Sequence, residues 1–223
     1  MNRTKRCFII AFVSAAVFAL FTFAVGIADV QAIGPENSVV GFATLNRKFF
    51  ELTGVNMIWY EITDYLGIAA VCIAFAFAVA GAIQLFKRKS LLKVDYRILA
   101  LGALYVIVIA VYFLFEYVTV NYRPILMNGK LESSYPSSHT MIVVTISTTG
   151  VIALKEMCRK RNLFTIISTV FAVTLSTVTV IGRLISGVHW LSDIVGGLLV
   201  SMTLIFLYLA LISLVSDKTK MPT

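Results

Sequence analysis

The chain has 223 residues, of which 59% are hydrophobic and 13% are charged. Soluble domains carry about 25% charged residues, so this composition excludes an ordinary soluble fold and favours a membrane protein. The formal charge of +8 does not indicate nucleic-acid binding, because the basic residues lie in short clusters between apolar runs, where the positive-inside rule accounts for them. We therefore expect the bilayer, and no nucleic acid, as a partner.

Six apolar runs follow one another, separated by polar or turn-rich stretches, at about residues 7–28, 65–86, 98–119, 139–154, 163–182 and 190–214. A helix needs about 20 apolar residues to cross a hydrocarbon core about 30 Å thick. The pattern predicts an all-α polytopic membrane protein with six transmembrane helices in a single domain over residues 1–223. A cleaved signal peptide is the alternative for the first run, which precedes Val30-Gln31-Ala32, but its length favours a retained helix.

The loops fall into two sets by their Lys and Arg content. Fourteen basic residues lie before the first run, in residues 87–97, in 155–161 and in 218–220. The other set holds only Arg47, Lys48, Arg123, Lys130 and Arg183. The positive-inside rule then predicts that both termini are cytoplasmic and that segments near 30–64, 120–138 and 183–189 face outward. We expect a multi-pass protein of the plasma membrane, and a bacterial one from the compact chain.

Residues 38–64 mix aromatic and aliphatic side chains with polar ones. The mixture predicts an amphipathic helix at the outer interface, where it could border a path for lipid. An outer loop packed on the helix bundle is the alternative.

Polar and ionisable residues gather in three segments, 116–124, 135–140 and 182–193. Such residues at membrane helix ends are costly unless they are paired or hydrated, so their position is informative. By the predicted topology, all three segments reach the same outer face and can converge on one site.

The residue types in these segments suit phosphoryl transfer. Arg123 and Arg183 offer planar guanidinium groups that match phosphate oxygens. Ser137 and Ser138 open the fourth helix, whose N-terminal amides and dipole favour an anion. We expect these four residues to bind the phosphate.

The two histidines of the chain both fall in these segments. His189 precedes Asp193 by four residues, one helical turn, so the carboxylate can face the ring and hydrogen-bond one nitrogen. The other nitrogen would then be free to attack phosphorus. The cysteines Cys7, Cys72 and Cys158 are too few and too scattered for a disulfide framework or a metal site, and we expect no metal and no cofactor.

Together the three segments resemble the tripartite motif of the type 2 phosphatidic acid phosphatase (PAP2) superfamily. That motif runs Lys, six residues, Arg-Pro; then Pro-Ser-Gly-His; then Ser-Arg, five residues, His, three residues, Asp. In this chain it corresponds to Glu116 with Arg123-Pro124, to residues 136–139, and to Gly182-Arg183 with His189 and Asp193.

The resemblance implies a metal-independent mechanism in two steps. His189 attacks the phosphate to form a phosphohistidine while His139 protonates the leaving oxygen, and water then hydrolyses the intermediate with His139 as base. Arg123, Arg183, Ser137 and nearby amides hold the transferring group.

Glu116 occupies the position where the motif has lysine, two helical turns before Arg123. It could pair with Arg123 or Arg183 and orient it, meet a cation on the substrate, or weaken the site. Lys130 could replace the missing cation, although an exposed loop lysine is the simpler interpretation. Ser138 for glycine and Gly182 for serine are milder departures.

The leading hypothesis is a membrane lipid phosphatase acting on undecaprenyl diphosphate, phosphatidic acid or phosphatidylglycerol phosphate. One alternative is a phosphotransferase, in which an acceptor hydroxyl replaces water in the second step. Another is a non-catalytic lipid-binding or transport protein on the same fold. The substrate and the oligomeric state do not follow from the motifs.

Overall fold

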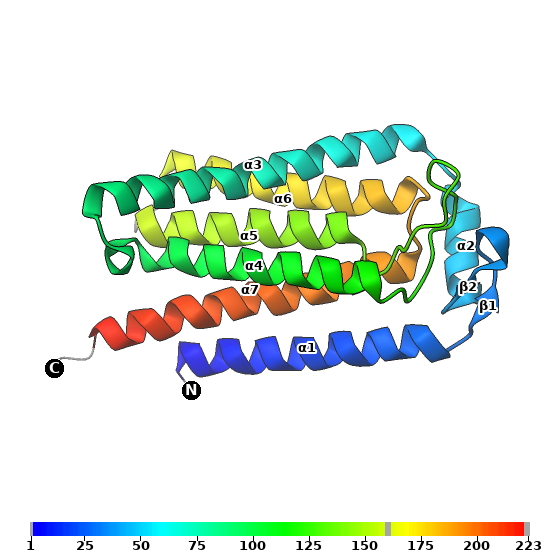
Figure 1. Ribbon diagram of the computed structural model, residues 1–223, viewed down its shortest axis with the longest axis horizontal. Coiled ribbons are helices and arrows are strands. Elements are labelled where there is room, and N and C mark those ends of the chain that lie inside the picture. Colours follow the sequence, from blue (N-terminus) through cyan, green and yellow to red (C-terminus); the bar gives the residue numbers. More distant parts are fainter. Residues whose placement is uncertain (1, 159–161, 221–223) are drawn as a thin grey trace.

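The computed structural model describes residues 2–158 and 162–220. Its long helices are α1 (Arg3–Ile27), α3 (Met57–Arg88), α4 (Tyr96–Tyr117), α5 (Ser138–Cys158), α6 (Leu163–Ile185) and α7 (Leu191–Lys220), gathered in one bundle (Figure 1). All six are long and apolar enough to cross a membrane, α7 over Leu191–Asp217. The predicted all-α bundle of six membrane helices is confirmed.

The shorter elements are β1 (Gln31–Ala32), the 3₁₀ helix η1 (Pro35–Asn37), β2 (Val39–Val40), α2 (Ala43–Thr53) and the 3₁₀ helix η2 (Leu91–Lys93). Strands β1 and β2 form a small antiparallel pair with Gln31 opposite Val40. Helix α2 lies across one end of the bundle, beside this pair (Figure 1).

The predicted interfacial helix over residues 38–64 is wrong in its extent. Helix α2 covers only Ala43–Thr53, and it ends where Gly54 takes a φ of 64°. The Asn56 side chain then accepts a hydrogen bond from the Trp59 amide at 3.4 Å and starts α3. Residues 57–64 therefore belong to a membrane helix, because a glycine stop and an asparagine cap interrupt the amphipathic segment.

The two ends of the bundle differ in what they carry. The start of α1, the α3–α4 connection, the end of α5, the start of α6 and the end of α7 lie at one end (Figure 1). Helix α2, the loop of residues 118–137 and the α6–α7 turn lie at the other, so the three polar segments share one end as expected. Arg159, Lys160 and Arg161, counted among the basic loop residues, lie outside the described residues. Which end faces the cytoplasm stays a prediction.

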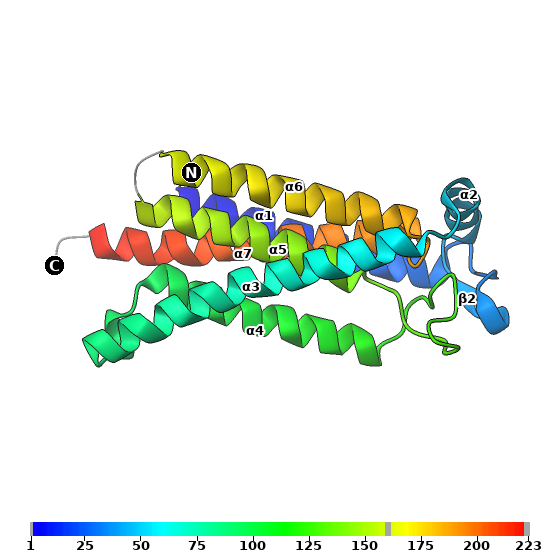
Figure 2. The same cartoon turned by 90° about the horizontal axis from the view of Figure 1, so that it is seen from above.

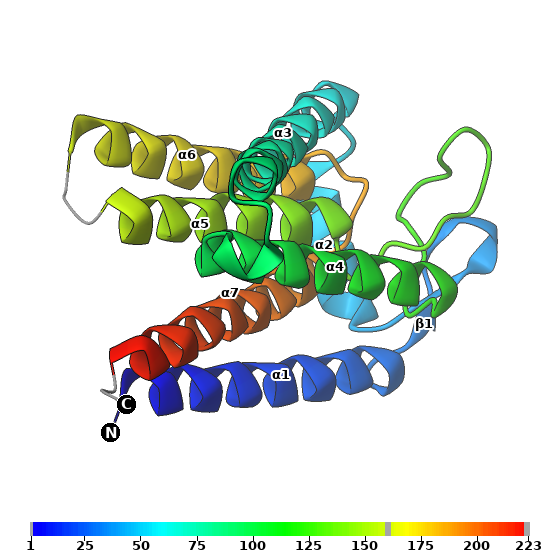
Figure 3. The same ribbon diagram turned by 60° about the vertical axis from the view of Figure 1, so that its left-hand side comes forward.

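Helix α7 packs against α1 on one side and against α4 and α5 on the other (Figure 3). The main core between α4, α5 and α7 includes Leu101, Leu104, Met141, Leu204 and Tyr208. Helix α3 packs on α5, α6 and α4 (Figure 2). The polar end is therefore built on helices that are fixed by apolar packing.

Candidate active site

A cavity of about 220 Å³ opens at the polar end of the bundle, between α4, the 118–137 loop, the start of α5 and the α6–α7 turn. Its lining includes both histidines, Arg123 and Ser138, and also Glu116 and Glu132. Three segments that are far apart in the sequence thus meet around one space. It is the space that the sequence predicts for a phosphate.

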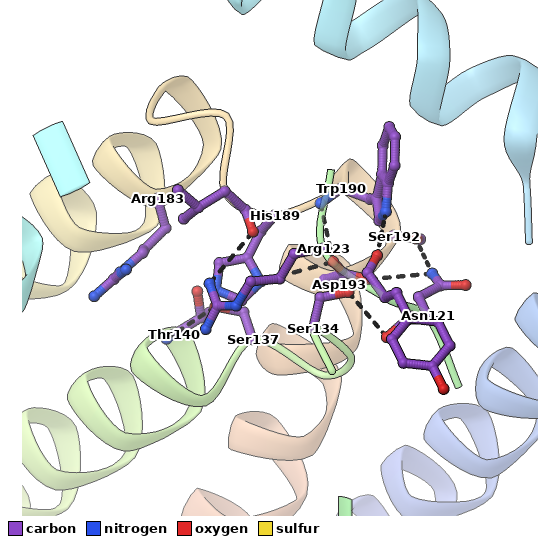
Figure 4. Close-up of polar contacts among 12 residues, drawn as sticks. Asn121, Arg123, Ser134, Ser137, Thr140, Arg183, His189, Trp190, Ser192 and Asp193 are labelled. Atoms are coloured by element: carbon purple, nitrogen blue, oxygen red, sulfur yellow. Dashed lines mark hydrogen bonds and ion pairs between the residues drawn. The ribbon is translucent and has the colours of Figure 1, made fainter. Parts of the chain in front are cut away.

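The 118–137 loop holds Arg123 through a short paired stretch. The Arg123 amide donates to the Glu132 carbonyl at 2.9 Å, and bridges join Tyr122 to Ser133 and Met127 to Lys130. The Arg123 side chain forms an ion pair from Nε to Glu132 Oε2 at 3.2 Å and is largely buried. Nη1 donates to the Val188 carbonyl at 3.4 Å, so the guanidinium lies against the turn that carries His189 (Figure 4).

A buried polar network ties this loop to the start of α7 (Figure 4). The Asn121 amide Nδ2 donates to Asp193 Oδ1 and to Ser192 Oγ, each at 3.2 Å. Its Oδ1 accepts from the Gly41 amide at 3.0 Å, and Asn46 Nδ2 donates to Ser192 Oγ at 2.9 Å. Asn121, Asn46 and Asp193 are all fully buried. The loop, the segment before α2 and the first turn of α7 are therefore positioned together.

Asp193 lies beside His189 as predicted, with Oδ2 at 3.6 Å from Nδ1. That distance is longer than a hydrogen bond. The same Oδ2 accepts from the Trp190 amide at 2.9 Å, and the Asp193 carbonyl accepts from the Ser137 amide at 2.9 Å. In this arrangement Asp193 holds the α6–α7 turn and the start of α5 together, and its carboxylate faces the Nδ1 side of the imidazole.

His189 is almost completely buried, with 4% of the residue's surface exposed. Burial, followed by the positive charges of Arg123 and Arg183, holds the pKa of His189 well below its usual value. A neutral imidazole is the form that can act as a nucleophile. Neither ring nitrogen has a hydrogen-bond partner among the described residues.

Arg183 is fully buried near the end of α6, and its guanidinium carbon lies 4.9 Å from the centre of the Tyr60 ring. Nη2 forms an ion pair with Asp64 of α3, and Nε and Nη1 have no hydrogen-bond partner among the described residues. A buried guanidinium with two unused donors is costly unless an anion completes it. The arrangement suits a phosphate oxygen.

His139, in the first turn of α5, lines the cavity and also contacts Asp64, with Nε2 at 3.1 Å from Oδ1. Ser137 precedes the helix and caps it, since its Oγ accepts from the Thr140 amide at 3.4 Å. Ser138 lines the cavity beside His139. The start of α5 thus points a histidine and a helix N-terminus at the same space.

Glu116 lines the cavity but makes no ion pair among the described residues. Of the three alternatives for Glu116, an ion pair with Arg123 or Arg183 is not found in this structure, because Glu132 and Asp64 take those positions. Lys130 is exposed at the tip of the loop and is absent from the cavity lining, so it does not replace the motif lysine.

Three polar residues of the site were not singled out from the sequence: Asp64, Asn121 and Glu132. Asp64 is the last ionisable residue before the apolar run at 65–86. A carboxylate next to an apolar membrane segment is a signal that could have identified it. Asn121 and Glu132 act through contacts that loop folding creates. No spacing pattern in the sequence predicts that Asn121 and Glu132 belong to the site.

The chain is similar to known proteins both in sequence, to a protein family, and in structure. Residues 117–216 match the model of the PAP2 superfamily. This range includes both histidines, both arginines and Asp193, and begins one residue after Glu116. No curated protein matches the chain by sequence.

Among solved structures, the chain is similar to the transmembrane PAP2-type phosphatidylglycerolphosphate phosphatase from Bacillus subtilis. The TM-score is 0.59 at 15% sequence identity, and the match covers 95% of this chain and 98% of the other. At this identity the likeness concerns the fold. Residues 117–216 are therefore similar to the PAP2 superfamily, and nearly the whole chain shares the fold of this transmembrane phosphatase.

Proposed function

We propose that the chain is a membrane lipid phosphatase that transfers the phosphate of a lipid headgroup first to His189 and then to water. The observation that carries the proposal is the convergence of His139, His189 and Arg123 on one cavity at an end of the membrane bundle. An amphiphile in the bilayer presents its phosphate at this level, while its apolar chain stays in lipid.

The first chemical step follows from the positions of the histidines. The lone pair of His189 Nε2 forms a bond to phosphorus, since Nδ1 faces Asp193. The bond between phosphorus and the leaving oxygen breaks, that oxygen takes the electron pair, and His139 supplies a proton to it. Arg183 and Arg123 stabilise the charge on the remaining phosphate oxygens.

In the second step a water molecule attacks the phosphohistidine. His139, now neutral, removes a proton from this water, and the bond between nitrogen and phosphorus breaks to release inorganic phosphate. Both steps use side chains alone, and we propose no metal or cofactor for them. Ser137 and Ser138 place the α5 N-terminus at the transferring group, where its amides favour an anion.

The substrate class is a lipid phosphate or diphosphate, with undecaprenyl diphosphate, phosphatidic acid and phosphatidylglycerol phosphate as candidates. The structural neighbour is a phosphatidylglycerolphosphate phosphatase, which makes that lipid the first to assay. By the positive-inside rule, we place the site on the outer face of the plasma membrane and both termini in the cytoplasm.

The test is phosphate release from these lipids by purified protein in detergent, with wild type beside His189→Ala. We expect vanadate-sensitive release by wild type, and loss of both turnover and phosphoenzyme trapping in the variant. Phosphate that appears on an added alcohol without free phosphate would indicate a phosphotransferase. If phosphate were transferred from none of the lipids tested, the result would indicate a non-catalytic lipid-binding or transport protein.

A further inference from the structure

Each histidine of the site faces its own carboxylate. His189 lies beside Asp193, one turn later in the chain, whereas His139 on α5 faces Asp64 on α3. The second pair joins two helices and involves a segment outside the matched residues 117–216. Helix α3 therefore adds a fourth segment to the three that the motifs provide.

The approach of α3 depends on glycines at the contact. A Cβ atom on Gly67, one turn after Asp64, would lie 3.0 Å from His139 Cδ2 and 3.3 Å from Nε2. A Cβ atom on Gly182 would lie 2.5 Å from Thr63 Cγ2 and 3.0 Å from Trp59 Cε3. The motif has serine at position 182. In this chain Gly182 leaves the space in which α3 packs against α6. This packing brings Asp64 to Arg183 and His139.

The two nitrogens of His139 have different surroundings. Nε2 lies 3.1 Å from Asp64 Oδ1, and Nδ1 is buried without a hydrogen-bond partner among the described residues. His139 lines two spaces, the cavity that His189 also lines and a cavity of about 430 Å³ that Asp64 and Gly67 line. The His139 ring is therefore held by α3 through Nε2, and the residue also borders the cavity of His189.

We infer that Asp64 is a positioning residue for the proton transfer by His139. Its carboxylate accepts the hydrogen on Nε2, which orients the ring and stabilises its positive charge, so that Nδ1–H points to the leaving oxygen. When the bond between phosphorus and that oxygen breaks, the Nδ1 proton moves to the oxygen and His139 becomes neutral. The inference rests on the proposed function, because it assigns a role within that reaction.

Asp64 also pairs with Arg183, and the two roles predict different kinetics. Loss of support for Arg183 weakens stabilisation of the phosphoryl group, which is common to every substrate. Loss of support for His139 slows only reactions whose leaving oxygen needs a proton. An alkyl phosphate expels a strongly basic alkoxide, whereas 4-nitrophenyl phosphate expels a stable phenolate. Dependence on the leaving group therefore separates the two roles.

The experiment compares kcat/KM of Asp64→Asn and wild type for hexyl phosphate and 4-nitrophenyl phosphate, because kcat/KM reports formation of the phosphoenzyme. For hexyl phosphate we expect a fall of about 10–100-fold, the usual effect of removing a group that orients a reactive residue. We expect the fall to appear in kcat with KM little changed, and to be several-fold smaller for 4-nitrophenyl phosphate. Glu61→Gln, an exposed carboxylate three residues earlier on α3, is the matched control and should leave both rates unchanged.

A second variant keeps the test decisive if Asp64→Asn fails to fold with Arg183 unpaired. Gly67→Ala retains the carboxylate and favours the helix, but its methyl group displaces the His139 ring. It should show the same selective loss for hexyl phosphate. Equal losses for the two substrates in either variant would overturn the role of Asp64 through His139. Wild type that releases no phosphate from any substrate would instead refute the proposed function.

Discussion

Replacement of Asn121 by leucine tests whether the buried network holds the site together. Asn121 is fully buried and bonds to the Gly41 amide, Asp193 Oδ1 and Ser192 Oγ. Leucine has a similar size but leaves the Gly41 amide and Asp193 Oδ1 without these partners. Each orphaned buried group costs about 1–3 kcal/mol, so the variant should lose roughly 2–6 kcal/mol. For a chain of this length, that corresponds to a melting temperature lower by about 5–20 °C.

Ser192→Ala is the graded comparison, because it removes a hydroxyl that accepts from Asn46 and Asn121. Both donors keep another acceptor, the Gly41 carbonyl for Asn46 and Asp193 Oδ1 for Asn121. We expect a cost of about 1 kcal/mol, near that of a single hydrogen bond. Thermal unfolding in one detergent measures both variants. If Asn121→Leu melts no lower than Ser192→Ala, the network does not carry the stability assigned to it.

Three further predictions concern charge and backbone shape. Burial lowers the pKa of His189 below 6.5, the value in the unfolded chain. At a pH below 6.5 the unfolded chain therefore binds a proton that the native chain does not, and the free energy of unfolding falls as the pH falls. Melting from pH 7 to pH 5 should therefore show a smaller slope in His189→Gln than in wild type. Gly187→Ala should destabilise the protein by more than about 1 kcal/mol, because Gly187 has a φ of 70° and an added Cβ would meet the Gly54 backbone. Gly102→Ala should not destabilise it, because an added Cβ there has no atom within 4 Å outside its own helix. Glu116→Lys should lower KM for hexyl phosphate several-fold, because it replaces a repulsion of about 1 kcal/mol by an attraction; an unchanged KM would place Glu116 away from the phosphate.

The helices follow from local composition, and the sequence predicts them well. Six apolar runs of sufficient length can only span the bilayer as helices, since backbone groups in lipid must be satisfied within the segment. The helix ends were harder to place. Helix α3 starts at Met57, eight residues before its apolar run, because the Asn56 cap decides the start and hydrophobicity does not.

Some contacts of the site follow from local sequence spacing, and others arise only from tertiary folding. His189 and Asp193 are neighbours through helical spacing, so their proximity follows from the sequence. The partners of the arginines do not follow from spacing. Glu132 reaches Arg123 across a folded loop, and Asp64 reaches Arg183 from a different helix. Glu116 has the helical spacing for a pair with Arg123, but α4 ends at Tyr117 and the chain leaves the helical path before Arg123.

The carboxylates around the cavity bear on how a phosphate enters. Arg123 is paired with Glu132 and Arg183 with Asp64, while Glu116 lines the cavity of His189 and Arg123 without an ion pair among the described residues. Two arginines facing three carboxylates leave no surplus of positive charge from these groups for a dianion. Arg183 keeps Nε and Nη1 without a hydrogen-bond partner among the described residues, and in the proposed mechanism these donors and a protonated His139 would bind the phosphate. Phosphate binding and protonation of His139 would then be coupled, and Asp64 contacts both Arg183 and His139.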